Sequence, residues 1–280
     1  MRWKTVLALA LLVLLAAEGF AMCRTERTEC RLAVLMYHHF DQESTMDTVV
    51  SAQRFREQMT ALKEGGFTAV TLSQLLEYVD GGTPLPDRPV LITMDDGYTS
   101  NLTIAAPILE ELGLCATVFV IGVNEGEQTY VHTGKPLLPA RFSYEEAAAW
   151  VEKGVLDLQS HTYDMHQLPS YGVSGRAGVL QMEGEEPETY QAVLGEDMRL
   201  FRQRREGRVA TDLVALAYPF GYHCQAAEDF FQAEGIAVTF TTQEHINRLR
   251  VGDPSSLRLL GRYNVTDRCT GQELVQRLIK

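Results

Sequence analysis

Two histidines lie close together in the middle of the chain, in the stretch SHTYDMHQL at residues 160–168. On a helix, a five-residue separation rotates the second side chain by roughly 500°, which carries it well off the first face. On a strand, an odd separation puts the two side chains on opposite faces. His161 and His166 can therefore meet only on a turn. There, two imidazoles are suited to bind a metal ion; otherwise they are unrelated surface histidines.

Two adjacent aspartates, Asp95 and Asp96, follow the apolar run RPVLITM and precede Gly97. An Asp-Gly pair is common in turns, so a turn alone is one explanation. Two neighbouring carboxylates also allow a division of labour, in which one binds a metal ion and the other takes a proton from water. One carboxylate and two histidines would leave a fourth metal position open, as in catalytic zinc sites.

Clusters of polar residues fall at the ends of four predicted strands. The strands are residues 31–37, 88–94, 155–160 and 213–218, and the clusters are YHHF, MDDG, SHTYDMH and YPFGYH, in that order. Active sites of β/α barrels and of open α/β sheets are built at the carboxyl ends of the strands. The four clusters therefore predict a single site.

Apolar strands alternate with amphipathic helices along the chain. Residues 51–66 predict a helix with Ser51 as its cap and Gly65 as its stop, and Ser143 with Glu146 forms a capping box for the next clear helix. Further predicted helices are 100–113, 188–205, 226–235 and 271–280, and further strands are 115–122, 236–242 and 257–265. The pattern predicts an α/β fold, a distorted (β/α)7-type barrel with a single catalytic domain. An open doubly wound sheet is the alternative, but no glycine-rich phosphate loop follows the first strand.

Three short motifs together resemble the polysaccharide deacetylases of carbohydrate esterase family 4, the NodB-homology domain. They are Asp95-Asp96-Gly97 after LIT, His161-Thr162-x-x-x-His166, and Tyr218-Pro219-Phe220-Gly221. Each motif alone is weak, whereas the three in this order, each at a strand end, are specific. The resemblance spans residues 31–266.

The resemblance implies hydrolysis of an N-acetyl group on an amino sugar. In that family the first aspartate is the general base, and the second aspartate and both histidines hold a divalent metal, usually Zn²⁺. Carried over, the base is Asp95 and the metal ligands are Asp96, His161 and His166. The backbone N–H of Phe220 would help to stabilise the oxyanion.

The chain departs from the commonest family pattern in three ways. Four residues instead of three separate the histidines, Ala217 replaces an arginine often found two residues before Pro219, and a late leucine-x-histidine that supplies the general acid is missing. These departures resemble the subgroup that acts on poly-N-acetylglucosamine in biofilm matrices, where the acid comes from an early Tyr-His pair. We assign the acid role to His38, with His39 as the second candidate; two surface histidines are the plain alternative.

Four more residues beside the motifs are candidates for contacting the sugar: Tyr98, Tyr218, Pro219 and His223. Simple exposure explains His223 equally well. Asp164, inside the histidine stretch, is expected to orient a ligand or the loop, and His132 is given no role.

The expected function is metal-dependent N-deacetylation of a β-linked N-acetylglucosamine polysaccharide. Poly-N-acetylglucosamine, peptidoglycan of the cell wall and chitin-like chains are not separated by the sequence. Two other functions stay open, an O-acetyl esterase using the same site and a non-catalytic carbohydrate-binding pseudoenzyme. The presence of Asp95 beside a complete ligand set argues against the pseudoenzyme, because a binding protein needs neither metal ligands nor a spare base.

The first 21 residues differ from the rest of the chain. Arg2 and Lys4 precede an apolar run of twelve residues from Val6 to Ala17, which is short for a membrane span of roughly 20 residues. A secretory signal peptide is predicted for residues 1–21, with a retained N-terminal anchor as the alternative. Residues 22–30 would form a tether and residues 31–280 the deacetylase domain. We therefore expect an extracytoplasmic protein, secreted or membrane-anchored at the cell surface.

Charge and cysteine content narrow the partners. The formal net charge of −12 is poorly suited to binding phosphate backbones, so no nucleic acid is expected. The five cysteines are too scattered for a zinc ribbon and too few for a disulfide scaffold. The expected partner is an extracellular amino-sugar polysaccharide, with a membrane tether through the N-terminal segment if that segment is retained.

Overall fold

The computed structural model describes residues 28–42 and 48–279. The predicted signal peptide or anchor, and most of the predicted tether, lie outside the described residues. Within the described part of the chain, every helix is too short or too polar to cross a membrane.

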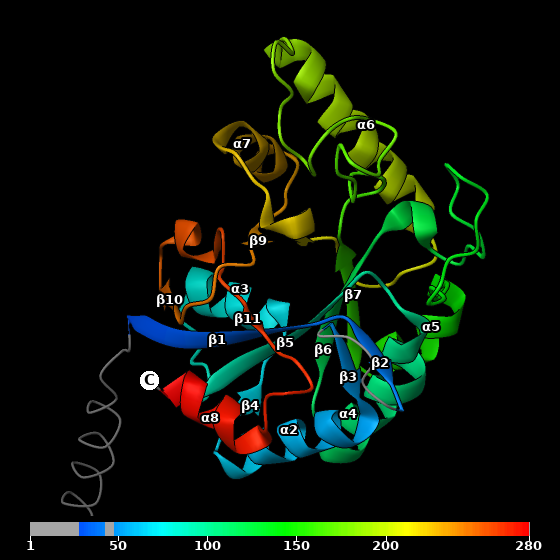
Figure 1. Cartoon of the computed structure of the whole chain (residues 1–280). Helices are drawn as coiled ribbons and strands as arrows, with labels where there is room; N and C mark the ends of the chain where they lie inside the picture. The colour runs from blue at the N-terminus through cyan, green and yellow to red at the C-terminus, as the bar shows by residue number, and fades with distance from the viewer. Residues whose placement is uncertain (1–27, 43–47, 280) are drawn as a thin grey trace, which may run out of the picture.

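A curled, mostly parallel sheet forms the centre of the molecule (Figure 1). Its strands lie in the order β10-β1-β5-β6-β7-β8-β9, with short β4 added beside β5 and β11 beside β1. All neighbouring strands are parallel except β1 and β10. The bounds are β1 Glu29–Tyr37, β4 Thr68–Ala69, β5 Pro89–Asp95, β6 Ala116–Val120, β7 Leu156–Ser160, β8 Ala215–Ala217, β9 Val238–Phe240, β10 Asn247–Arg250 and β11 Tyr263–Asn264. The sheet curls into a half-barrel, which confirms the predicted α/β barrel-type fold.

Helices cover the sheet in three groups. The outer face of β1, β5, β6 and β7 packs against α2 (Ala52–Glu64), α4 (Ala106–Leu112), α5 (Tyr144–Glu152) and α8 (Gly271–Ile279). The β8 side packs against α6 (Pro187–Arg205) and α7 (Gln225–Ala233). Apolar residues of α3 (Leu72–Gly81) join the inward-facing residues of β1, β5, β8 and β9 in a separate core cluster.

Strand alternation decides which side chains enter the barrel. On β5, Val90, Ile92 and Met94 belong to the outer core and Leu91 to the inner one. Because successive strand residues point to opposite faces, Asp95 at the end of β5 points inward with Leu91.

The local signals for helix ends are confirmed. The Ser51 side chain accepts a hydrogen bond from the Arg54 amide and caps α2, which ends at Gly65. Ser143 and Glu146 form the predicted capping box of α5. These contacts satisfy amide groups that a helix leaves unpaired in its first turn.

Four segments differ from the sequence-based prediction. The helix predicted at 100–113 begins with a π-helical turn, Asn101–Ala105, and continues as α4, with Pro107 in its first turn, where proline is tolerated. The strand predicted at 257–265 is reduced to β11, and Pro254–Leu257 is a 3₁₀ turn. Helix α3 was not predicted, although Thr71 and Gln74 form a capping box for it. Strand β10 was missed because its two exposed positions are arginines, Arg248 and Arg250.

A short two-stranded sheet, β2 (His39–Asp41) with β3 (Val49–Ser51), follows β1.

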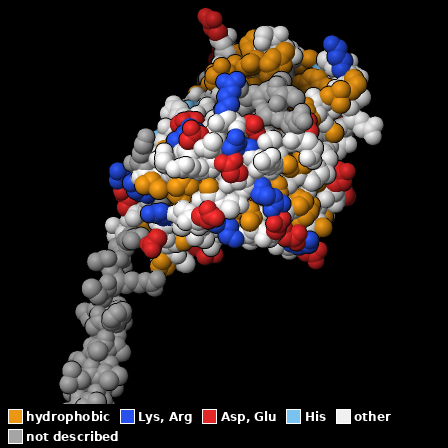
Figure 2. Space-filling view, turned by 60° about the horizontal axis from the view of Figure 1, so that its bottom comes forward, with side chains coloured by type: hydrophobic (Ala, Val, Ile, Leu, Met, Phe, Trp, Pro, Cys, Tyr) orange, Lys and Arg blue, Asp and Glu red, His pale blue; other side chains and the backbone are white. Residues whose placement is uncertain are grey.

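On the face that comes forward in Figure 2, Lys and Arg side chains are interspersed with Asp and Glu. Surface ion pairs such as Arg56–Glu111 and Arg277–Glu244 contribute little to stability.

Candidate active site

The carboxyl ends of β5 and β7 bring three predicted metal ligands together. His161 follows β7 directly, and its Nε2 lies 3.6 Å from Asp96 Oδ1. His166 Nε2 lies 3.5 Å from the same oxygen. The three ligating atoms all lie within 4.8 Å of one another, and this is the one group of potential metal ligands found among the described residues. The polar residues at these two strand ends do converge on one point.

The two histidines meet because the chain turns between them. Thr162 has a φ of 69°, and its hydroxyl accepts a hydrogen bond from the Met165 amide at 3.1 Å. The amides of Tyr163 and Asp164 donate to the two carboxylate oxygens of Asp197 on α6, at 2.7 and 2.9 Å. We call residues 161–166 the histidine loop. Its shape is set by its own threonine and by one buried acid from a neighbouring helix.

Backbone strain is concentrated in the three motifs. Four non-glycine residues among those described have a positive φ, and three of them are Asp96, Thr162 and Phe220. Such conformations are uncommon for residues with a β-carbon and persist only where the surrounding structure enforces them. Each motif therefore holds one residue in a backbone conformation that costs free energy, as is typical of functional sites.

The chemistry of this cluster fits a divalent cation. Asp96 Oδ1 is buried and has no hydrogen-bond partner among the described residues. His161 Nδ1 lies 2.7 Å from the carbonyl oxygen of Ala217, so Nε2 is the nitrogen left to face Asp96. Burial lowers the pKa of His166 to about 4, which keeps this imidazole neutral near pH 7. An unpaired buried carboxylate oxygen that faces two imidazole nitrogens is a donor set suited to a divalent cation.

Asp95 is held by a residue that the sequence did not point to. Both of its carboxylate oxygens bond to the guanidinium of Arg262, at 2.6 and 2.8 Å. Arg262 is fully buried, donates to the carbonyl of Thr241, and lies over the rings of Phe119 and Phe240. Burial would raise the pKa of Asp95, but the charges of Arg262, His161 and His38 and the hydrogen bonds from Arg262 together hold that pKa below its usual value. Asp95 is therefore ionised and fixed in orientation.

Two sequence features could have indicated Arg262. Arginine inside an apolar stretch that folds into the core requires a buried acidic partner, and LLGRYNV is such a stretch. The arginine often found two residues before Pro219 in the family pattern is also absent, because Ala217 occupies that position. Neither feature identifies the pair by itself, because the two residues are 167 positions apart in the chain.

His38 and His39 are separated by the structure. His39 Nδ1 lies 2.8 Å from the Ser100 hydroxyl, and its ring packs on Tyr98. His38 follows β1, is half-buried, and its charge acts on both Asp95 and Asp96. The Asn101 side chain donates to the His38 carbonyl at 2.9 Å, which ties this residue to the π-helical turn. Of the two histidines, His38 is the one whose charge reaches both aspartates.

A match to a family profile identifies the protein family of this chain. The profile described as Polysaccharide deacetylase matches residues 82–244, more than half of the chain. The chain belongs to the polysaccharide deacetylase family. All three motifs lie within the matched residues.

Two relatives and one solved structure are similar to this chain. The poly-beta-1,6-N-acetyl-D-glucosamine N-deacetylase of Escherichia coli K12 is 28% identical over 149 residues, 51% of this chain and 22% of that protein. The enzyme of the same name from Staphylococcus epidermidis is 27% identical over 195 residues, 70% of this chain and 62% of that protein. The chain thus spans less than two thirds of the length of either. The structure of IcaB from Ammonifex degensii has a TM-score of 0.72 at 23% identity, covers 90% of this chain and 98% of its own, and shares the fold.

The third motif of this polysaccharide deacetylase forms a tight turn beside the histidines. Phe220, in the 3₁₀ turn Pro219–Gly221, has a φ of 60°, and its ring centroid lies 4.3 Å from that of His166. The rings of Tyr171 and Tyr222 lie next to Phe220, and both are exposed. An aromatic rim therefore borders the metal-ligand cluster.

The other predicted sugar contacts are placed differently. Tyr98 lies between His39 and the guanidinium of Arg141, which sits 3.7 Å from its ring centroid. Tyr218 is fully buried and its hydroxyl donates to Glu228 on α7 at 2.6 Å, so its side chain is turned away from the cluster. Pro219 is also buried, and His223 Nδ1 is taken by the carbonyl of Gly221 at 2.9 Å. The structure does not bring the side chains of Tyr218 and His223 to the metal ligands.

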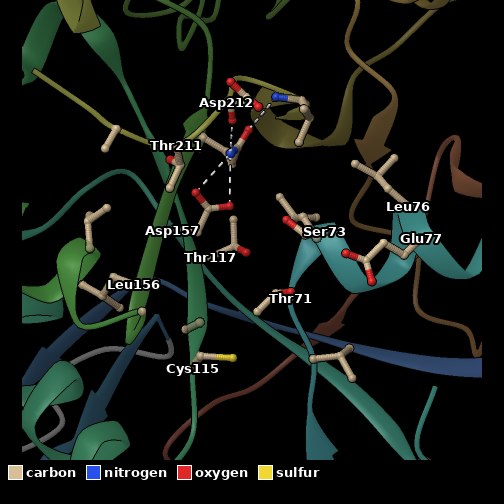
Figure 3. Close-up of a pocket in the computed structure, with 18 residues that line it drawn as sticks. Thr71, Ser73, Leu76, Glu77, Cys115, Thr117, Leu156, Asp157, Thr211 and Asp212 are labelled. Atoms are coloured by element: carbon tan, nitrogen blue, oxygen red, sulfur yellow. Dashed lines mark hydrogen bonds between the residues drawn. The ribbon is translucent and has the colours of Figure 1, made fainter. Parts of the chain in front are cut away.

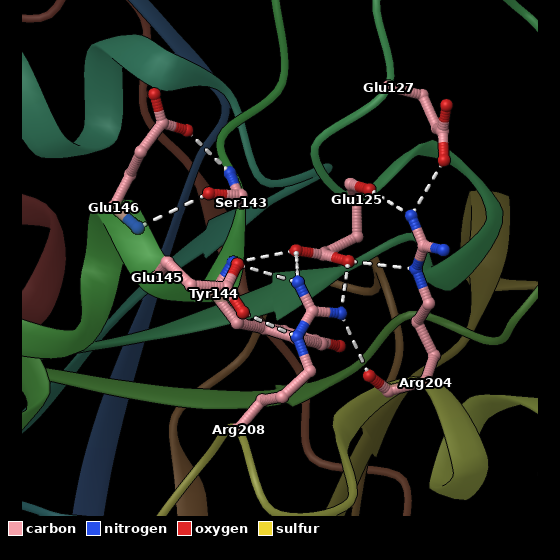
Figure 4. A network of polar contacts seen from close by, with 8 residues as sticks. All are labelled: Glu125, Glu127, Ser143, Tyr144, Glu145, Glu146, Arg204 and Arg208. Carbon is pink, nitrogen blue, oxygen red and sulfur yellow. Dashed lines mark hydrogen bonds and ion pairs between the residues drawn. The ribbon is translucent and has the colours of Figure 1, made fainter.

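A polar network anchors the segment between β6 and α5 (Figure 4). Glu125 has a fully buried side chain and accepts hydrogen bonds from Arg204 at 2.8 Å, Arg208 at 2.9 Å and the Tyr144 amide at 2.6 Å. Arg208 continues to Glu145, so α5 and the end of α6 are joined. Farther along the same segment, beyond the network, His132 bonds to Asp164 of the histidine loop at 2.7 Å. The network thereby supports one wall of the site.

Proposed function

We propose that this chain is a hydrolase that removes N-acetyl groups from a β-linked N-acetylglucosamine polysaccharide, and that poly-β-1,6-N-acetylglucosamine is its substrate. The observation that carries the proposal is the convergence of Asp96, His161 and His166 beside the arginine-held Asp95. Membership of the polysaccharide deacetylase family supports the reaction class. The names of the Escherichia coli and Staphylococcus epidermidis relatives support the choice of polymer.

In this proposal Asp95 acts as the general base. Its carboxylate is ionised, buried and oriented by Arg262, so it can take a proton from a water molecule without first losing one. Asp96, His161 and His166 would hold a divalent cation, most simply Zn²⁺. When bound there, the cation supplies a Lewis acid for the amide carbonyl and lowers the pKa of an attacking water.

His38 would protonate the leaving amine. It lies at the end of β1, and its charge reaches both aspartates. The backbone N–H of Phe220 is proposed to stabilise the oxyanion, supported by the positive φ that holds this residue beside His166. Tyr98, Tyr171 and Tyr222 would pack against sugar rings, because aromatic faces combine apolar area with few rotatable bonds.

Two other functions remain as alternatives. An O-acetyl esterase would use the same base and ligands, so only the substrate distinguishes it. A non-catalytic carbohydrate-binding protein has no use for a strained ligand turn and a buried base held by arginine. Peptidoglycan and chitin-like chains are the alternative polymers.

We place the reaction outside the cytoplasm, at the cell surface, with residues 31–280 as one catalytic domain. The signal-like residues 1–21 support this location. Strand β1, near the start of this range, belongs to the central sheet, and α8 at its end packs in the same core as β1. This arrangement supports a single domain.

The test is acetate release by the purified chain, zinc-loaded and chelator-stripped. Substrates are β-1,6 and β-1,4 N-acetylglucosamine oligomers, peptidoglycan and O-acetylated xylan. Zinc-dependent release is expected, fastest on the β-1,6 oligomers. It should be lost in Asp95→Asn and unchanged in Asp80→Asn, which alters an exposed carboxylate on α3.

The pattern of failures separates the alternatives. Release from acetylated xylan alone would replace the proposal with the esterase. Zinc binding without release from any substrate would remove the proposed reaction, and the absence of both would favour the binding protein. Faster release from β-1,4 oligomers or peptidoglycan would change the polymer and leave the mechanism in place.

A further inference from the structure

A cavity lies at the opposite end of the barrel from the metal ligands (Figure 3). It has a volume of about 530 Å³ and is enclosed by α3, by the starting halves of β6 and β7, and by the segment that leads into β8. Small-molecule sites commonly have volumes in this range, ~300–1,000 Å³. The proposed active site is built from strand carboxyl ends, so the two sites are separated by the length of the strands.

The wall of this cavity carries acidic groups and no cation. Its carboxylates are Asp157, Glu77 and Asp212, and no Lys, Arg or His lines it among the described residues. Arg205 is the cation whose charge reaches Asp157, but its guanidinium donates to the carbonyls of Leu158 and Thr211. An anionic ligand would be repelled here, and a cationic ligand would be attracted.

Asp157 is an incompletely compensated carboxylate. It is half-buried on β7, and its side chain accepts hydrogen bonds from the Gln159 side-chain amide, at 3.0 and 3.2 Å. The Thr211 hydroxyl and the Leu158 backbone also act on it and lower its pKa, so its remaining partners are neutral groups. Gln159 is itself anchored through the Asp212 carbonyl and the amides of Val214 and Ala215. Burial raises the pKa of Asp157 above its usual value, as expected for a carboxylate without a cationic partner.

Two threonine hydroxyl groups lie next to Asp157 in the cavity wall. Thr117 is only 1% exposed. In Figure 3 it lies in the cavity wall beside Asp157, and no hydrogen bond joins its hydroxyl to another residue drawn there. Thr211 Oγ1 is buried and makes no hydrogen bond of full geometry among the described residues, and its one polar neighbour is the Asp157 carboxyl, whose pKa it lowers as a weak donor. Buried polar groups are rarely left unpaired, so each unpaired one requires an explanation.

We propose that this cavity is a binding site for a small protonated amine that also carries hydroxyl groups, such as an amino sugar. The ammonium would bind Asp157, and ligand hydroxyls would bind Thr117 and Thr211. Leu76 and Leu156 in the same wall would pack against the carbon skeleton. The carboxylates of this wall do not form a group of metal ligands; the one such group among the described residues is at the other end of the barrel.

The ligand can come from two sources with the same chemistry, a free amino sugar or the end unit of a deacetylated chain. Glucosamine and its β-1,6-linked trimer are the two probes, and N-acetylglucosamine is the uncharged comparison. The choice of glucosamine rests on the proposed function, whereas the cavity and its charge do not.

The test is isothermal titration calorimetry of the full chain with each probe. Wild type and Asp96→Asn should bind glucosamine equally, because Asp96 lies at the other end of the barrel. Asp157→Asn should weaken glucosamine binding at least about tenfold, the loss expected for one charge-assisted contact. Thr117→Val should weaken it less, and Asp80→Asn, an exposed carboxylate on α3, should not change it. The Asp96→Asn variant should bind N-acetylglucosamine weakly or not at all, because this uncharged sugar has no ammonium group for Asp157.

Three results would overturn the proposal: no glucosamine binding to wild type, equal binding by wild type and Asp157→Asn, or loss of binding in Asp96→Asn alone. Tighter binding of the trimer than of glucosamine would identify a chain end as the source, and the reverse order a free amino sugar. Acetate release by Asp157→Asn should stay within about twofold of wild type, so this test and the test of the deacetylase activity can fail separately.

Discussion

At the scale of single residues, the pairing of Asp95 with Arg262 has the largest consequence. A carboxylate in the barrel interior would be strongly disfavoured without a partner, and the bidentate guanidinium keeps it charged and aimed. The proposed base is therefore available as a proton acceptor because a second buried residue stabilises its ionised form. Arg262 is a positioning residue in this account, since it acts through Asp95.

Replacement of Arg262 by methionine should destabilise the fold. Arg262→Met leaves the Asp95 charge buried and unpaired, and the free energy of unfolding should fall by about 3–5 kcal/mol. Urea unfolding followed by circular dichroism measures this. Adding Asp95→Asn to Arg262→Met should restore part of the loss, because the unpaired charge is removed. Equal losses in the single and double variants would mean that Arg262 acts only by filling space.

Replacement of the two neighbouring histidines should have unequal effects on activity. His38→Gln removes the proposed acid, and kcat should fall about 10²–10⁴-fold. His39→Gln is the matched control: its ring is engaged by Ser100 and Tyr98, and kcat should change less than about tenfold. Steady-state acetate release measures both. The assignment of the acid would be reversed by the opposite order.

At the scale of elements, the histidine loop depends on helix α6. Asp197 on α6 accepts both the Tyr163 and the Asp164 amides, and Thr162 closes the turn from within. His132 reaches the same loop from the segment between β6 and α5. The distance between His161 and His166 is thus set by contacts from two other parts of the chain.

The stability of the protein should depend on pH through Asp197. Burial raises the pKa of Asp197 to about 7, against the lowering effect of the two backbone amides. The ordinary pKa of this carboxyl is 3.8. Between that pH and about pH 7, the folded state therefore keeps a proton that the unfolded state has already released. Stability from this group is present at acidic pH and is lost as pH rises through 7.

Thermal unfolding across this pH range measures the effect. Asp197→Asn cannot titrate, so the decrease in Tm from pH 5 to pH 8 should be smaller than in wild type by several degrees. The difference between the two proteins is the readout, because histidines titrate in both. Parallel pH curves would show that Asp197 is already ionised throughout.

At the scale of the whole molecule, the half-barrel holds one proposed site at each end of its strands. The carboxyl ends carry the strained motifs and the aromatic rim, and the amino ends carry the acidic cavity under α3. Charge and packing at one end are separated from the other by a layer that includes Phe119, Phe240 and Arg262. A substitution at one proposed site should therefore have little effect on the other.

Removal of metal should lower stability as well as activity. Without a cation, Asp96 is buried with an unpaired oxygen, so chelation should lower Tm and abolish acetate release. Adding zinc back should restore both. Asp96→Asn should have a Tm that no longer responds to chelator. A chelator-insensitive Tm in wild type would contradict a metal at this site.

Much of this protein follows from local sequence. Ser51, Gly65, Ser143 and Glu146 mark helix ends because capping contacts join residues only a few positions apart. Asp96, His161 and His166 could be grouped from sequence because each follows an apolar parallel strand, and the carboxyl ends of such strands share one side of a sheet.

The tertiary structure alone decided the remainder. The partner of Asp95 lies 167 residues away, Tyr218 faces Glu228 instead of the site, and His39 is turned aside by Ser100. These facts depend on which strands become neighbours and on the direction of each side chain, and neither is encoded within a few residues. Residue identity and spacing determine which chemistry is available, whereas packing over long sequence distances determines which groups meet.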